Sequence, residues 1–465
     1  MNAAGASRAI ARFSARFDRS QLTEAHIATC GRAIADTVAV AIAGWREPTA
    51  LRALDYALHL EGAGPGRLWG RSERVGLETA VLCNGIAAHA LDYDDGATPM
   101  GGHPSVVLLP ALLALADLRG LNGTDVALAY TVGFEVACGI GTAMSQAHFA
   151  RGWHLTSTIG TLASAAACAR LLGLDEDATC HAIGLAFART GGSRASFGTD
   201  AKSLQAGEAS AAGLRAALLA ETGFTAAPDA IDGALGFTTL YSEGESIASA
   251  LEGLGTAPLV IDASGVEIKK YPACYALHRP LDGLLDLRSE HGLTPENVAR
   301  IDVLASRAAL APLLSRLPVD GTEGRFSMQY VLAAAIWDGA VTLPSFAYDA
   351  VLRDELRPLM ARIHSSEADG PVLPRWAELT VTLTDGRSHK RRIEMLRGSP
   401  RLPLTDEELL GKVTDCLAWG DSGIEPTAFL TAAMEFGSFS VCALVDVLSP
   451  KPPHLTRERL DEHFA

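Results

Sequence analysis

Apolar residues recur every three or four positions through most of residues 5–260, which predicts a succession of helices. Glycine and proline interrupt this pattern at intervals, and no repeat of fixed length is visible, so a solenoid is not supported. Two segments, residues 160–169 (GTLASAAACA) and 206–220, are rich in small side chains. Because small residues let helix axes approach closely, these segments predict helices buried between other helices.

The pattern changes near residue 260. Alternating apolar and polar positions predict strands at 259–270 and 298–305. Residues 379–384 and 391–395 flank Asp385-Gly386, which predicts a β-hairpin with a tight turn. Helical patterns lie between and after these strands, at residues 279–289, 326–339, 405–419 and 426–448. Thr405, with Glu408 three residues later, predicts the cap of the third of these helices.

These patterns predict a mainly α protein with an α+β part. Residues 1–265 form a large all-helical domain, and residues 266–402 form a smaller α+β domain. The C-terminal helices, residues 403–465, are expected to return to the helical domain.

Composition narrows the classes of partner. The chain has 465 residues, is 48% hydrophobic and carries a formal charge of −15, which disfavours nucleic acid and anionic membranes as partners. No uninterrupted apolar run approaches the ~20 residues of a membrane-spanning helix. The eight cysteines contain no CxxC pair, so we expect free thiols in a cytoplasmic protein.

One motif gathers carboxylates and histidines. His89-Ala-Leu-Asp92-Tyr-Asp94-Asp95 is followed by Gly101-Gly-His103-Pro104. Crowded carboxylates perturb one another's pKa values, which suits metal binding or acid–base work. Because Pro104 fits a first helical turn, His103 should lie at the start of a helix. The alternative is an exposed acidic turn with a capping histidine.

Other candidate residues are single side chains in distinctive surroundings. His154 follows Gly152-Trp153, and Lys202 precedes an Ala-rich helix. Lys269, His278 and Arg279 belong to a cationic cluster that could clamp carboxylates, and Tyr330 opens a helix. Taken singly, each has a structural alternative: a core histidine, a surface cation or a packed tyrosine. Cys274, in the same cluster, is interpreted as structural.

Several common catalytic motifs are absent from the sequence. It contains no GxGxxG after a strand, no GxxxxGK[ST], no HExxH and no GxSxG. The remaining chemistry is proton transfer by His, Asp, Lys and Tyr side chains.

As an ordered set, these motifs resemble the MmgE/PrpD family. The matching stretches are NGIAAHALDYDD…GGHPS, GWHLTSTIGTLASAAACARLLGL, FGTDAKSLQAGEAS, EIKKYPACYALH and RFSMQY, spanning roughly residues 80–335. The family includes 2-methylcitrate dehydratase, cis-aconitate decarboxylase and iminodisuccinate epimerase. The resemblance implies a helical domain, a smaller α+β domain, an active site between them, a homodimer, a small anionic carboxylate substrate, and no metal or organic cofactor.

The resemblance also implies site residues. Positions that match those lining the family's active site are Asp92, His103, His154, Lys202, Lys269, His278 and Tyr330. Asp92, His103, His154 and Tyr330 are predicted to be catalytic, with a histidine of pKa near 7 carrying the proton. Lys202, Lys269 and His278, together with the neighbouring Arg279, are predicted to bind substrate carboxylates.

The chain departs from the family pattern at three places. Gly96 stands where many members have Thr, Gln205 where a histidine often occurs, and His278-Arg279-Pro280 where dehydratases tend to have His-Ala/Ser-Gln. The leading expectation is a hydro-lyase that moves a proton next to a carboxylate. The alternatives are an iminodisuccinate-type epimerase, a cis-aconitate-type decarboxylase and a non-catalytic ligand-binding relative.

Overall fold

The computed structural model describes residues 5–244 and 246–448, and its chain divides into two compact units. The helical unit comprises the chain up to Glu267 and from Leu410 onward, and the mixed unit is Ile268–Leu409. The sequence patterns place these divisions at 265/266 and 402/403. The second division of the structure falls within a helix, α18 (Asp406–Trp419).

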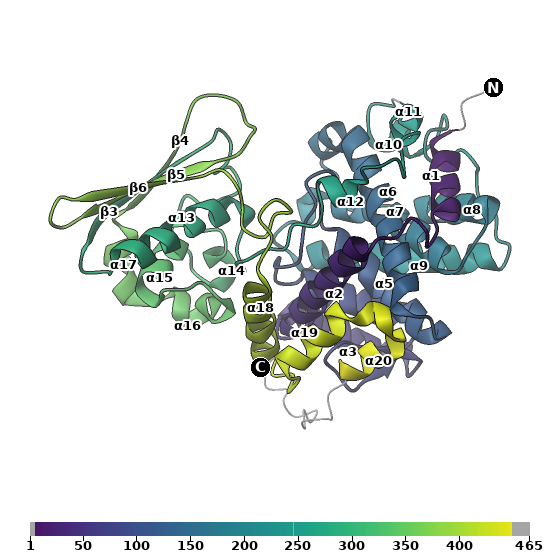
Figure 1. Cartoon of the computed structure of the whole chain (residues 1–465), viewed down its shortest axis with the longest axis horizontal. Helices are drawn as coiled ribbons and strands as arrows, with labels where there is room; N and C mark the ends of the chain where they lie inside the picture. The colour runs from purple at the N-terminus through teal and green to yellow at the C-terminus, as the bar shows by residue number, and fades with distance from the viewer. Residues whose placement is uncertain (1–4, 245, 449–465) are drawn as a thin grey trace. The chain divides into compact units, whose positions relative to one another are not determined.

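Among its described residues, the helical unit contains a two-residue antiparallel ladder, β1 (Gly66–Arg67) and β2 (Arg74–Val75). Most of its other described elements are α-helices (Figure 1). The α-helices before the mixed unit are α1 (Ala6–Arg16), α2 (Glu24–Gly44), α3 (Pro48–Tyr56), α4 (Leu77–His89), α5 (Pro104–Arg119), α6 (Gly123–Ala150), α7 (Leu155–Leu171), α8 (Glu176–Phe187), α9 (Asp200–Glu221), α10 (Phe237–Tyr241), α11 (Ala248–Leu251) and α12 (Val260–Ala263). After it come α18, α19 (Pro426–Met434) and α20 (Val441–Val447), and the shorter π- and 3-10 turns are η1 (Ala57–Glu61), η2 (Arg194–Ser196) and η5 (Phe436–Ser438).

Small residues allow the central helices of this unit to pack closely, as the sequence predicts. α7 is buried at every position except Arg170. Gly85 of α4 faces Gly207 of α9, and a Cβ added at Gly85 would lie 2.7 Å from the Cα of Gly207. A side chain at either glycine would therefore separate the two helices that flank the site described below.

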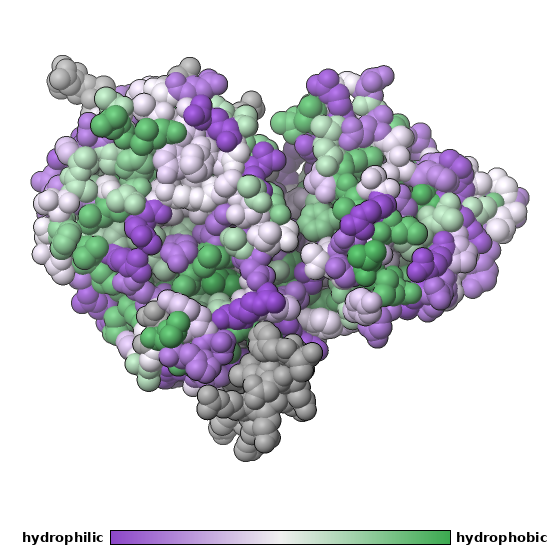
Figure 2. Space-filling view, turned by 180° about the vertical axis from the view of Figure 1, so that it is seen from behind, coloured by the Kyte–Doolittle hydropathy of each residue, from purple (hydrophilic) through white to green (hydrophobic). Residues whose placement is uncertain are grey.

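Two helices of this unit are long and apolar enough to cross a membrane by length and composition, α2 and the part of α6 from Gly123 to Met144. In these helices 78% and 83% of the most apolar window is buried inside the structure, as is typical of core helices. Figure 2 shows small groups of hydrophobic residues separated by hydrophilic ones on one face, a mixture common on water-exposed surfaces.

A buried ion pair joins α18 to α2. The Lys412 Nζ lies 2.5 Å from Asp36 Oδ1 and donates to the Tyr93 carbonyl at 2.9 Å, and both charged side chains are almost fully buried. Replacing Lys412 with Met is expected to lower the free energy of unfolding by about 3–5 kcal/mol, because it removes the ammonium group that faces a buried carboxylate. Chemical denaturation of the purified variant measures this.

The matched control is the double variant Lys412→Met/Asp36→Leu, which removes both charges. It should be clearly more stable than Lys412→Met alone, since both buried charges of the pair are removed together. A single variant as stable as the parent protein would contradict a structural role for the pair.

The mixed unit contains a four-stranded sheet of order β4-β3-β5-β6 with helices beside it (Figure 1). β3 pairs in parallel with β4 (Ile301 opposite Ile363) and antiparallel with β5, and β5 pairs antiparallel with β6. The elements are α13 (Tyr275–His291), β3 (Val298–Ala305), α14 (Gly321–Gly324), α15 (Met328–Asp338), η3 (Leu343–Phe346), α16 (Tyr348–Val351), η4 (Asp354–Leu356), α17 (Arg357–Met360), β4 (Ile363–Glu367), β5 (Ala377–Leu383) and β6 (Ser388–Ile393).

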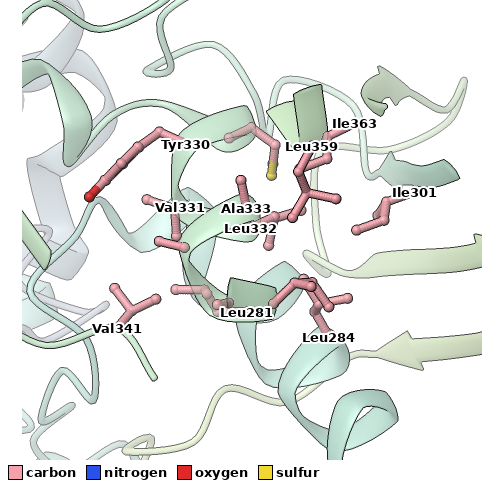
Figure 3. Packing of buried hydrophobic residues seen from close by; sticks show 14 of the residues in the cluster. Leu281, Leu284, Ile301, Tyr330, Val331, Leu332, Ala333, Val341, Leu359 and Ile363 are labelled. Atoms are coloured by element: carbon pink, nitrogen blue, oxygen red, sulfur yellow. The ribbon is translucent and has the colours of Figure 1, made fainter. Parts of the chain in front are cut away.

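The core of the mixed unit lies between the sheet and helices α13 and α15 (Figure 3). Leu281 and Leu284 of α13 pack with Val331 and Leu332 of α15 and with Ile301 of β3. Alternate residues of β5 are buried, whereas no residue of the edge strand β6 is. β6 carries basic side chains, which discourage pairing with another sheet edge.

The strand over 298–305 and the hairpin around Asp385-Gly386 are confirmed as β3 and β5–β6. The capped helix at 405–419 is also confirmed, since Thr405 and Glu408 form reciprocal side-chain to backbone hydrogen bonds. The strand β4 was not predicted, because only its first residue is buried and it lacks an alternating pattern.

Two predicted elements are wrong. Residues 259–270 form the short helix α12 and an isolated bridge at Glu267 instead of a strand, because the Glu135 carboxylate accepts hydrogen bonds from the amides of Val260 and Ile261. The single helix over 426–448 is broken into α19, η5 and α20. Its middle is held by the start of α6, through a bridge between Asn122 and Ser440.

Candidate active site

Three helices of the helical unit begin beside one another. His103 is the N-terminal flanking residue of α5 and His154 that of α7, while Lys202 lies in the first turn of α9. The starts of α5 and α7 are joined by the His103 amide, which donates to Thr156 Oγ1 at 3.2 Å. The prediction that His103 lies at the start of a helix is confirmed. Helix N-termini carry partial positive charge, so their meeting favours an anionic ligand.

The three carboxylates of the loop after α4, Asp92, Asp94 and Asp95, contact different partners. Asp92, whose φ of 52° is in the left-handed region, lies 2.6 Å from the Lys202 Nζ. Asp94 is buried between His89 and His103, with its Oδ2 2.8 and 3.1 Å from their Nδ1 atoms. Asp95 is buried, and its carboxylate accepts hydrogen bonds from Ser105.

The alternative of an exposed acidic turn is therefore wrong for Asp94 and Asp95. Burial alone would raise the pKa of Asp94, but the adjacent His103 and His89 hold that pKa well below its usual value. Asp95 has the opposite shift, because burial and then the charge of Asp36 raise its pKa well above the ordinary range. Asp94 is thus the ionised member of this buried pair.

Three histidine rings lie together at this place. The His89 ring is 4.7 Å from that of His103 and 6.1 Å from that of His154, measured between centroids. Burial lowers the pKa of His89 to about 4 and that of His154 to about 3, with nearby Lys202 adding to both shifts. His154 is therefore neutral at physiological pH, which differs from the predicted pKa near 7.

Gln205 and Phe197 complete the surroundings of His154. The Gln205 Oε1 lies 2.7 Å from His154 Nδ1, and the Phe197 ring meets the imidazole edge-on at 5.0 Å. The Lys202 Nζ lies 5.9 Å from the centre of the same phenyl ring. The four site residues predicted in this unit, Asp92, His103, His154 and Lys202, thus lie in one cluster.

The same cluster has ligand atoms close enough for a cation. One atom from each of His89, Asp92, Asp94 and His103 lies within 4.8 Å of the others. However, Lys202 already places an ammonium group on Asp92, and Asp94 is already matched by the two histidines. A divalent ion would have to compete with these partners, so we assign no metal to the cluster.

The other four predicted site residues belong to the mixed unit. Lys269 and His278 lie around one ring: the Lys269 Nζ is 5.3 Å from the centre of Tyr275, and His278 stacks on Tyr275 at 5.0 Å. The His278 Nε2 also lies 3.0 Å from the Ala273 carbonyl oxygen. This arrangement brings together two of the predicted carboxylate-binding residues.

Arg279 and Tyr330 have partners within the mixed unit. Arg279 Nε donates to the backbone carbonyl of Glu394 at 3.3 Å. Tyr330 is fully buried, and its hydroxyl, which points away from the apolar cluster in Figure 3, donates to the Ser345 carbonyl. Burial raises the pKa of Tyr330 to about 12. The substrate-binding and catalytic roles of these residues stay predictions.

His89, Asp94 and Gln205 were not among the predicted site residues. His89 and Asp94 belong to the first motif, but the sequence could not show that both turn inward to meet His103. Gln205 was noted as a departure from the family pattern. Its position one helical turn after Lys202 was the available signal, since residues three apart share a helix face.

Comparison with known proteins agrees with this architecture. Residues 8–250 match the MmgE/PrpD N-terminal domain, and residues 271–422 match the MmgE/PrpD C-terminal domain. Cis-aconitate decarboxylase of Homo sapiens is 29% identical over 93% of this chain and 92% of its own length. The Mus musculus enzyme is also 29% identical, over 84% and 83%, and an Aspergillus terreus cis-aconitate decarboxylase is 26% identical over 82% of each chain. The two matched domains cover most of the chain, which therefore belongs to the MmgE/PrpD family.

Proposed function

We propose that the protein is a lyase that decarboxylates cis-aconitate or a closely related unsaturated tricarboxylate. The observation that carries the proposal is the cluster of Lys202, His103 and Asp94, which combines a carboxylate-binding cation with a proton carrier. Decarboxylation replaces dehydration as the leading reaction for two reasons. The similar curated proteins are named as cis-aconitate decarboxylases, and the chain departs from the dehydratase pattern at Arg279.

The reaction needs one proton donor. The bond between the departing carboxylate and the methylene carbon breaks, and its electrons form a new terminal double bond. The electrons of the original double bond take a proton at the carbon next to the other terminal carboxylate. Cis-aconitate trianion and one proton thus give CO2 and the 2-methylenesuccinate dianion.

The cluster offers a group for each requirement. Lys202 supplies a positive charge to a substrate carboxylate, and the starts of α5, α7 and α9 add their partial charges. The His103 ring lies 3.1 Å from Asp94 and 3.8 Å from Asp92, so two carboxylates orient it. In this proposal His103 delivers the proton to the substrate carbon.

Proton NMR in heavy water tests the proposal. Purified protein is incubated with cis-aconitate and, separately, with citrate, 2-methylcitrate and iminodisuccinate. We expect cis-aconitate to give 2-methylenesuccinate with one deuterium at the saturated methylene. Water loss from citrate or 2-methylcitrate would support a dehydratase instead, and exchange at the α-carbon of iminodisuccinate would support an epimerase. A folded protein that changes none of these acids would overturn the proposal and favour a non-catalytic relative.

Removal of divalent metals is expected to leave the activity unchanged, because the carboxylates of the cluster already have ammonium and imidazole partners. The measurement is the decarboxylation rate before and after prolonged dialysis against EDTA, with the metal content checked by mass spectrometry. A loss of activity that zinc or manganese restores would instead assign a catalytic cation to His89, Asp92, Asp94 and His103.

A further inference from the structure

The hydrogen-bond network around Gln205 determines which nitrogen of His154 carries the proton. The Gln205 Nε2 donates to the Ser193 carbonyl at 3.2 Å, and a carbonyl oxygen only accepts. The amide oxygen of Gln205 therefore faces the other way, where it lies 2.7 Å from His154 Nδ1. Because this oxygen also only accepts, His154 must donate from Nδ1.

The backbone around this contact is fixed at several points. The His154 amide donates to the Gly192 carbonyl at 3.1 Å, and Trp153 and Ser193 form an isolated bridge. The Ser157 hydroxyl donates to the backbone carbonyl of Gln205 at 3.2 Å. Gly192 has a φ of 115° and no room for a side chain, since an added Cβ would lie 2.7 Å from Ser157 and 3.1 Å from Gln205 Oε1. The carboxamide is thus held between Ser193 and the imidazole.

We propose that Gln205 is a positioning residue that holds His154 as the Nδ1–H tautomer, so that Nε2 is the unprotonated nitrogen and can accept a hydrogen bond. This inference rests on the proposed function for its catalytic meaning. The two histidines then have different roles: His103 beside Asp94 donates the proton, and the neutral His154 presents an unprotonated Nε2 as a hydrogen-bond acceptor.

The charges facing His154 support this assignment. His89 of α4, His103 before α5 and Lys202 of α9 all lower the pKa of His154, in addition to burial. The nearby carboxylates already have partners: Asp92 pairs with Lys202, and Asp94 lies between His89 and His103. Gln205 is a neutral acceptor, so it orients the ring without adding the negative charge that would keep it protonated.

The first test is nitrogen NMR of the full chain labelled with 15N-histidine, with the His154 signals identified by their loss in His154→Gln. We expect the shift of a protonated Nδ1 and a bare Nε2 between pH 6 and 8. Gln205→Leu removes the acceptor and should give a mixture of the two tautomers. A protonated Nε2 in the parent protein, or an unchanged tautomer in Gln205→Leu, would overturn the inference. This readout needs no turnover, so it is independent of whether the proposed reaction is correct.

The second test is the pH profile of the decarboxylation. Gln205→Glu places a carboxylate beside His154 Nδ1, which favours the protonated ring, so the acidic limb of kcat/KM should move to higher pH. Gln205→Leu should lower kcat by about 10- to 100-fold and change KM little. This loss of kcat is smaller than the ~10⁴-fold loss caused by a wrong histidine tautomer in a serine protease. Gln205→His should recover activity, since a ring that donates to Ser193 accepts at its other nitrogen.

A merely structural role for Gln205 predicts other results. It would lower the melting temperature of Gln205→Leu and Gln205→Glu alike, and it would leave the acidic limb of the Gln205→Glu profile where it is. That outcome would overturn the inference even if the decarboxylation itself is observed. If Gln205→Leu does not fold, the nitrogen spectrum of the parent protein and the pH profile of Gln205→Glu still test the inference.

Discussion

Replacement of Lys202 with Met is expected to lower kcat/KM for cis-aconitate by about 10³-fold, or ~4 kcal/mol of transition-state stabilisation. Lys202 is paired with Asp92 at 2.6 Å and lies in the first turn of α9. Its loss removes the cation that a tricarboxylate needs, and it leaves Asp92 facing an anionic substrate. Steady-state kinetics of the purified variant measure the change, and a thermal melt checks that the variant is folded.

The matched control is Lys390→Met. Lys390 also forms an ion pair, with Glu378 at 2.8 Å, but it lies on the edge strand β6 and is 60% exposed. Exposed pairs contribute about 0–1 kcal/mol to stability, so this variant should behave as the parent protein does. Equal kinetics for Lys202→Met and Lys390→Met would remove Lys202 from the substrate-binding residues.

Replacement of His103 with Gln should lower kcat by about 10²- to 10⁴-fold, the usual contribution of a positioned general acid. The glutamine amide still offers a donor to Asp94, but it has no proton that it transfers at neutral pH. Substrate affinity should change much less than kcat, because Lys202 is intact. Single-turnover measurements of CO2 release separate the chemical step from substrate binding and product release.

His59→Gln provides the comparison for this variant. His59 also lies next to an aspartate, Asp55 at 3.0 Å, but its side chain is 55% exposed on the surface. This variant should retain full activity. A His103→Gln protein that still releases CO2 at the rate of the parent would show that another group delivers the proton.

Local patterns determined much of the architecture. The alternation over 298–305, the Asp-Gly turn and the Thr405 cap each specify an element through neighbouring residues, and each is present. The small residues of α7 and α9 likewise indicated close helix packing before any partner was known. Such features can be predicted correctly because their stability depends mainly on residues a few positions apart in the sequence.

Elements whose conformation depends on distant partners were missed. The Glu135 carboxylate of α6 accepts hydrogen bonds from the Val260 and Ile261 amides, 125 and 126 positions away in sequence, and this stabilises the start of the short helix α12. The chain around Ser440 leaves its helix because it pairs with Asn122. In both places a long-range hydrogen bond outweighs the local preference, and no local pattern reports it.

The family, the order of the chemical motifs and four of the residues that meet in the helical unit, Asp92, His103, His154 and Lys202, were all predicted from the amino-acid pattern. The electrostatics of these residues could not be predicted from it. The tertiary structure buried His154 and lowered its pKa to about 3, and it placed Asp94 between His89 and His103. It also set Gln205 against Nδ1 of His154. The reason is physical: a side chain's proton affinity depends on its burial and on the charges within a few ångströms, and folding brings these from four separate helices.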